Sequence, residues 1–463
     1  MTLTRRLIAS LIFAVLLATS AARPGLSQST PAEPAPAQPT AQTAPPQPAQ
    51  AYTLPPEKLA KAVALDRLRN ILDIVSGVWG IVFLWLLLAT RGAARMEALV
   101  QRVWSRRWQQ GLLFFALLLI VMTLASLPID AIGHYASVAN GISVQGWGSW
   151  AADQAKSLGL GVGLGSPILL LFNWIVRRWP RRYWFAAWLV ALPLMVLSVF
   201  ISPLFEPIFN HYEPLTKDHA SLVEKLETVV ARTGTNIPPD RMFLMKASEK
   251  TNGLNAYVNG LGATKRIVVW DTTAGRIPDD EVLFIFGHES GHYVLNHIPK
   301  MLTAGAVGLF FIFWACAGFA AWLAGRFGAA WGLGDGPGAP SFALSAKGGI
   351  PTLLASRTGF VVLLFATTLA GFLLEPVSNT FSRSFEHQAD VYGQEAIHGL
   401  VPGSRKTAVA SFQALGEAWL EDPNPNPVIE FWLYNHPSVK NRANFAAQYD
   451  PWDKGGRGEF FAR

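Results

Sequence analysis

The sequence is poor in charged residues. Asp, Glu, Lys and Arg together make up 15% of its 463 residues, whereas ordinary soluble domains carry about a quarter. Hydrophobic residues make up 51% of the chain. This composition excludes a water-soluble enzyme with an average surface and indicates a protein with several membrane spans.

Cysteine is almost absent as well, since Cys316 is the only one in the sequence. A single cysteine excludes an intramolecular disulfide and every zinc site built from several cysteines. The net charge of +7 is high enough to raise the question of nucleic-acid binding. We expect no nucleic-acid partner, because the basic residues cluster beside apolar runs, where they set the orientation in a membrane.

Six long apolar runs follow one another along the chain. They cover about residues 71–90, 111–129, 157–177, 183–202, 301–325 and 355–375. Buried core helices are shorter and carry more charge, whereas a membrane span needs about 17–25 mostly apolar residues. The sequence therefore predicts a mainly α, multi-span helical membrane protein that contacts membrane lipid.

The N-terminus has the pattern of a secretory signal. Arg5 and Arg6 precede a short apolar stretch, which is followed by small residues near Ala22. We expect a cleaved signal peptide, with a retained anchor as the alternative. Residues 31–56 contain nine prolines, which predicts an extended, disordered linker.

These features divide the chain into six parts. We predict a signal peptide or anchor at 1–22, a Pro/Ala-rich disordered linker at 23–56, a membrane domain with four transmembrane helices at 57–202, a catalytic region at 203–300, two transmembrane helices with a Gly/Pro-rich loop at 301–375, and a second catalytic region with a loosely ordered tail at 376–463. Within the first catalytic region, residues 221–234 resemble an amphipathic helix ending at Gly234, and residues 266–270 resemble a buried strand.

Arginines predict the orientation in the membrane. The 91–110 loop contains five of them, and the turn between the third and fourth runs contains Arg177, Arg178, Arg181 and Arg182. The positive-inside rule places both loops in the cytoplasm. Both catalytic regions then lie outside, which in a bacterium means the periplasmic side of the inner membrane.

The strongest chemical signal is the sequence His288-Glu289-Ser290-Gly291-His292. Pro278 and the acidic residues after it predict the start of a helix that continues through this motif. His288 and His292 then share one helical face and can bind one zinc ion. Glu289 projects beside the metal, where a carboxylate can take a proton from the water that the zinc activates.

Two histidines leave a catalytic zinc site one ligand short. Glu386 is the best candidate for the third, and Asp390 lies four residues further on the same helical face. We expect Asp390 to orient a zinc-bound histidine or to act in proton transfer. Arg383 could pair with either carboxylate. His297 is the rival third ligand, although on a continuous helix its offset turns it away from His292.

Two further stretches indicate substrate contacts. Asn255 stands in a Gly-rich segment before the expected strand, where its amide could bind a peptide backbone or an oxyanion. His436 is followed six residues later by Arg442, which could place a cation near the developing oxyanion.

With these residues in place, the chain resembles the type I CAAX prenyl protease family of integral-membrane zinc metalloproteases. The likeness runs from about residue 60 to 445 and is carried by ISPLFEPIFNHYEPL (201–215), NAYVNGLGATKRIVVWDTT (255–273), HESGHYVLNH (288–297), SRSFEHQAD (382–390) and NHPSVKNR (435–442).

The resemblance implies a gluzincin-type zinc metalloprotease domain that is split around two transmembrane helices and enclosed by the spans. It implies one zinc ion per chain, bound by His288, His292 and Glu386, with Glu289 as base and Asp390 as an active-site acid. Asn255, His436 and Arg442 would hold substrate or stabilise the tetrahedral intermediate. Members of the family cleave next to a prenylated cysteine, and some cleave non-prenylated peptides.

Two functions from different classes follow. The first is a zinc endopeptidase that hydrolyses unfolded or membrane-associated peptides. The second is a membrane transporter or channel with a structural zinc site. Asp73 is the main charged residue within the apolar runs, and such charges mark transport paths. A structural zinc normally has four protein ligands, which favours the peptidase.

Overall fold

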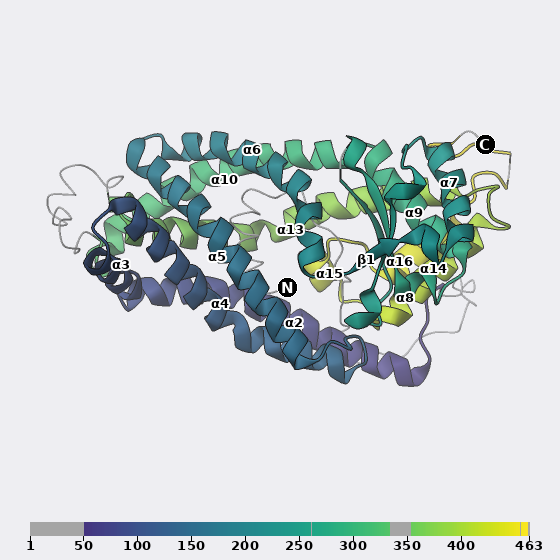
Figure 1. Ribbon diagram of the computed structural model, residues 1–463, viewed down its shortest axis with the longest axis horizontal. Coiled ribbons are helices and arrows are strands. Elements are labelled where there is room, and N and C mark those ends of the chain that lie inside the picture. Colours follow the sequence, from purple (N-terminus) through teal and green to yellow (C-terminus); the bar gives the residue numbers. More distant parts are fainter. Residues whose placement is uncertain (1–50, 261, 334–352, 454, 462–463) are drawn as a thin grey trace, which may run out of the picture.

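The computed structural model describes residues 51–260, 262–333, 353–453 and 455–461, so the expected signal peptide and most of the linker lie outside the described residues. Six described helices are long and apolar enough to cross a membrane (Figure 1). They are α2 (Pro56–Ala89), α4 (Arg107–Ala139), α5 (Trp147–Arg178), α6 (Tyr183–Phe205), α10 (His297–Phe327) and α13 (Arg357–Ala396). Each contains one of the six apolar runs, and large apolar side chains such as Trp314 and Phe311 point outward, as in helices that face lipid.

A four-stranded sheet lies at one end of the helical bundle (Figure 1). Its strands are β1 (Tyr212–Pro214), β2 (Met242–Met245), β3 (Ala256–Asn259) and β4 (Arg266–Trp270), in the order β1-β2-β4-β3. β2 and β4 are parallel, and the two outer strands are antiparallel to their neighbours. The expected strand at 266–270 is confirmed, and β3 is an edge strand.

Shorter helices lie at this end of the bundle, and most of them contribute to a second hydrophobic core, separate from that of the spans. They are α7 (Ala220–Thr233), α8 (Asp271–Ala274), α9 (Asp279–Val294), α14 (Ser404–Trp419), α15 (Pro427–Leu433) and α16 (Val439–Gln448). The amphipathic helix expected before Gly234 is α7, and Gly234 ends it with a φ of 66°, a left-handed conformation that glycine adopts without strain.

α13 connects the two cores. Its 40 residues make it about 60 Å long, roughly twice the hydrocarbon thickness of a bilayer. Its first half packs in the core of the spans, through residues such as Phe360 and Val361. Its second half packs against α9. The helix thereby carries Glu386 and Asp390 from the bundle into the part of the protein that contains the sheet.

The basic loops lie at the end of the bundle opposite the sheet. Helix α3 (Gly92–Val103) and the turn between α5 and α6 are both at this far end, to the left in Figure 1. Arg91 beside α3 donates hydrogen bonds to the carbonyls of Ala329 and Ala330 after α10. The two arginine-rich segments therefore face the same side of the bundle, as the positive-inside analysis requires.

Both flanking segments that we expected to be disordered differ from that expectation where they are described. Tyr52, in the expected linker, is fully buried and donates a hydrogen bond to the carbonyl of Glu421. In the expected loose tail, the backbone N–H groups of Phe460 and Phe461 donate to the buried carboxylate of Glu395 at 2.7 and 2.8 Å. A charged group removed from water needs such donors, so the tail stabilises the buried carboxylate near the end of α13.

The close approach of α9 and α13 depends on glycine. A Cβ atom added at Gly393 would lie 2.7 Å from the backbone nitrogen of His288. We expect Gly393→Ala to push α9 away from α13, because a backbone atom cannot move aside as a flexible side chain can. Gly371→Ala on the same helix is the matched control, since a Cβ there meets no atom within 4 Å.

Both alanines gain about 1 kcal/mol of helix propensity, so the difference between the variants isolates the contact. We expect the free energy of unfolding to be about 1–3 kcal/mol lower for Gly393→Ala than for Gly371→Ala. This difference would appear as a lower unfolding midpoint in detergent. Equal midpoints would show that the two helices tolerate a wider spacing.

Candidate active site

The HExxH motif lies on α9, and local sequence explains this helix. Pro278 precedes the first turn, and Asp279, Asp280 and Glu281 place negative charge at the positive end of the helix dipole. The following apolar residues bury the helix in the second core. The expected helix start is confirmed, and His288 and His292 lie one turn apart on the face toward α13.

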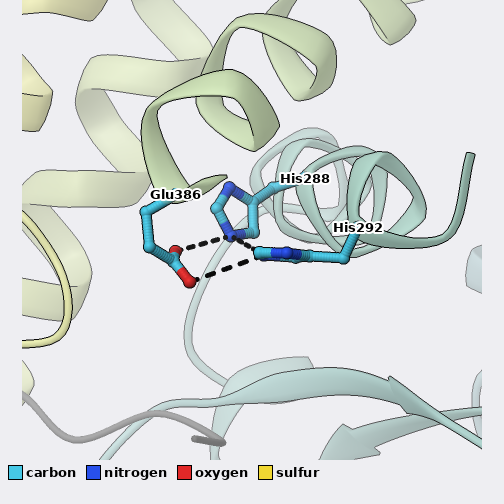
Figure 2. Close-up of side chains that lie close together, drawn as sticks. All are labelled: His288, His292 and Glu386. Carbon is cyan, nitrogen blue, oxygen red and sulfur yellow. Dashed lines mark hydrogen bonds and ion pairs between the residues drawn. The ribbon is translucent and has the colours of Figure 1, made fainter. Parts of the chain in front are cut away.

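Glu386 approaches these two histidines from α13 (Figure 2). Its Oε2 lies 3.2 Å from His288 Nε2, and its Oε1 lies 3.6 Å from His292 Nε2. The two Nε2 atoms are 3.2 Å apart. In the sequence Glu386 is about a hundred positions from the histidines, and the fold brings one ligand atom of each residue within 4.8 Å of the others.

The donor set fits a metal ion. Two imidazole nitrogens and one carboxylate are the ligands of a catalytic zinc site with an open position. The carboxylate of Glu386 is buried beside the Nε2 atoms of both imidazoles, where its oxygens could ligate a cation. Burial lowers the pKa of His292 to about 3, which leaves this ring neutral and able to bind metal.

His288 is held by a carboxylate. Its Nδ1 lies 2.8 Å from Asp390 Oδ1, so Asp390 orients one histidine of the group, which is one of the two roles expected for it. Burial lowers the pKa of His288, but its hydrogen bonds to Asp390 and Glu386 outweigh that effect and raise the pKa to about 9. A metal ion would have to displace this proton, so its binding would release a proton to solvent.

Arg442, expected to bring a cation near the oxyanion, lies beside the ligand group and pairs with Asp390. Its Nε and Nη2 donate to the two oxygens of Asp390 at 2.9 and 2.6 Å, a bidentate pair. Asp390 is buried and Arg442 is mostly buried, and Nη2 also lies 3.8 Å from Glu386 Oε2. The guanidinium therefore compensates the charge of Asp390 and fixes the direction of its contact with His288.

His436 reaches the same group of side chains. Its Nε2 lies 3.2 Å from Glu386 Oε1, and its Nδ1 lies 2.8 Å from Asn435 Oδ1. We expected His436 near the site from the sequence but missed Asn435, which lies against the other ring nitrogen.

Glu289 faces the edge strand rather than α13. The carboxyl group of Glu289 lies near the backbone N–H of Val258 on β3, and burial raises the pKa of Glu289 to about 7. One turn further along α9, the hydroxyl of Tyr293 donates to the carbonyl of Gly260 at 3.0 Å. These contacts place the carboxylate between the histidines and the free edge of the sheet. A carboxyl with a pKa near neutrality suits proton transfer at neutral pH.

Three expectations need correction or stay open. Arg383 pairs with neither carboxylate, because its guanidinium donates to backbone carbonyls including that of Tyr434. Asn255 is anchored through its backbone, which exchanges two hydrogen bonds of 2.8 Å with Thr273. The described contacts do not join Asn255 to the ligand residues, so its role stays a prediction.

The third expectation concerns His297. We expected one continuous helix through this residue, but α9 ends at Val294 and Asn296 adopts a left-handed φ of 58°. His297 then begins α10 and lies outside the ligand group. The signal for this break was Pro299, which is tolerated only in the first turn of a helix.

Comparison with known proteins identifies the family of the chain. The model of "Peptidase family M48" matches residues 216–450. The model of "CAAX prenyl protease N-terminal, five membrane helices" matches residues 38–211. The described part of this second match contains four of the candidate spans.

Relatives cover most of the chain. An uncharacterized metalloprotease of Bacillus subtilis, YhfN, is 31% identical over 396 residues, which are 85% of this chain and 86% of the relative. CAAX prenyl protease 1 of Saccharomyces cerevisiae is 27% identical over 344 residues, 72% and 71% of the two chains. The human homolog of that protease is 23% identical over 374 residues, 72% of each chain.

The crystal structure of S. mikatae Ste24p has the same fold, with a TM-score of 0.70 and 23% identity over 86% of this chain and 90% of that one. The family matches favour the peptidase over the transporter or channel. The chain belongs to peptidase family M48 and is a multi-pass integral-membrane metalloendopeptidase.

Proposed function

We propose that the protein is a zinc-dependent endopeptidase that cleaves unfolded or membrane-associated peptides, with His288, His292 and Glu386 as the zinc ligands. The observation that carries this proposal is the convergence of two imidazole nitrogens and one carboxylate from α9 and α13, with the Glu289 carboxylate beside them. A zinc ion in such a site lowers the pKa of water to about 7 and polarises a carbonyl group.

The residues of the chain supply the proton transfers and the orientation. Glu289 takes the proton from the attacking water and passes it to the amine that leaves, which its neutral-range pKa allows in both directions. Asp390 holds His288, and Arg442 acts through Asp390 rather than on the substrate. His436 lies beside Glu386, where its Nε2 can reach the oxyanion that develops on the peptide carbonyl.

The edge strand β3 offers a binding site for a peptide substrate. Among the described strands β3 is paired only with β4, and the backbone N–H of Val258 on β3 lies near the carboxyl of Glu289. An extended peptide that adds to this edge would run past the catalytic carboxylate, with backbone hydrogen bonds providing affinity for varied sequences. Asn255, directly before β3, would bind the backbone of such a peptide.

For location, we propose the inner membrane of a bacterium, with the active site on the periplasmic side. The two arginine-rich segments lie at the opposite end of the bundle from the site, which supports this orientation. Single cysteines placed at exposed Asp240 and Arg181 in a Cys316→Ala background would test it. An impermeant maleimide should label only the first on intact cells, and labelling of only the second would reverse the orientation.

The function is tested with protein purified in detergent. We expect about one zinc per chain and cleavage of an unmodified unfolded peptide, lost after chelation and regained when zinc is returned. A matched pair of CAAX peptides, prenylated and not, tests whether the specificity named for CAAX prenyl protease 1 of S. cerevisiae extends to this chain. A fully zinc-loaded protein that cuts none of these peptides would refute the proposal.

A further inference from the structure

His297 is a buried histidine without an assigned role. It has no accessible surface, and it is the first residue of α10, directly after the left-handed turn at Asn296. This turn separates α10 from α9. The ring of His297 stacks on Phe385 with centroids 4.6 Å apart, so its orientation is fixed by packing as well as by the turn.

The ring contacts the second histidine of the HExxH motif. His297 Nδ1 lies 3.1 Å from His292 Nδ1, within hydrogen-bonding distance. The opposite nitrogen of His292, Nε2, is the atom that belongs to the ligand group. The contact therefore involves the one nitrogen of His292 that is left over when the other binds a metal.

The chemistry of imidazole allows one arrangement of protons here. A neutral imidazole has one N–H and one nitrogen lone pair, and a metal at Nε2 of His292 uses the lone pair. His292 must then carry its proton on Nδ1 and donate it. His297 can accept only if its own Nδ1 is unprotonated, so it carries its proton on Nε2.

We propose that His297 is a positioning residue for His292, accepting the Nδ1–H hydrogen bond that leaves Nε2 free for the metal. This inference rests on the proposed zinc site. The two histidines of the motif are then held by different partners: the carboxylate of Asp390 holds His288, and a neutral imidazole holds His292. Such outer partners set the tautomer and the ring direction of a metal-binding histidine.

Two substitutions separate hydrogen bonding from packing. His297→Phe keeps a ring against Phe385 but removes the acceptor. His297→Asn removes the ring but places an oxygen where Nδ1 stood. We expect zinc affinity, measured by competition with a chelator at fixed pH, to fall about 10–100-fold in the Phe variant and to recover most of that loss in the Asn variant.

His387→Phe is the matched control, because His387 is exposed on α13 and touches Phe445 rather than the ligand group. Zinc affinity of His297→Phe within twofold of the wild type would overturn the inference, and so would equal losses in the Phe and Asn variants. If the Phe variant does not fold, a tenfold loss of zinc affinity in a folded Asn variant would overturn it as well. A wild-type protein that binds no zinc would instead refute the proposed function.

Discussion

Replacing Glu289 by glutamine is expected to abolish peptide cleavage while zinc stays bound. The amide keeps the size of the side chain but cannot take a proton from water. A positioned general base contributes about 10²–10⁴-fold to rate, so kcat should fall by at least that factor. The measurement is the turnover of an unfolded peptide together with the zinc content of each preparation.

Glu281→Gln is the control for this change, since Glu281 lies in the first turn of the same helix and away from the ligand group. Its activity should match that of the wild type. A Glu289→Gln protein that retains activity would show that the base is another residue. Loss of zinc along with activity would show that Glu289 helps to hold the metal.

Replacing Glu386 by alanine is expected to remove most of the metal affinity. Glu386 supplies the only carboxylate of the ligand group and the only ligand from α13. Its loss should weaken zinc binding by more than the roughly 10–100-fold caused by losing an outer hydrogen-bonding partner. Zinc should then no longer raise the unfolding midpoint, whereas at a hundred times its dissociation constant it stabilises the wild type by about 2.7 kcal/mol.

Two further variants sharpen this result. Glu386→Asp keeps the charge on a shorter side chain and should lie between alanine and the wild type in zinc affinity. The neighbouring His387→Ala should bind zinc as the wild type does, because His387 points away from the group. Full zinc binding by Glu386→Ala would remove Glu386 from the ligand set and require a different third ligand.

Local patterns predicted most of the fold. Each of the six apolar runs lies in a candidate span, and the helix before Gly234 and the strand at 266–270 are where the sequence placed them. These elements follow from hydrophobic periodicity and from signals at their ends, which act over a few residues. The same local logic placed His288 and His292 on one helical face. This reasoning gave a wrong prediction at residue 297, because helical spacing was considered without Pro299, which marks the start of a new helix.

Sequence alone thus determined the spans, the helix of the HExxH motif, and the placement of Glu386 and Asp390 on one face of a helix. Only the tertiary structure decided which side chains contact one another. Arg442 contacts Asp390, His436 contacts Glu386, and His297 contacts His292. Helical spacing says which side chains share a face, but it carries no information on which distant face packs opposite. These contacts depend on how closely α9 and α13 approach each other and on where α16 packs against α13.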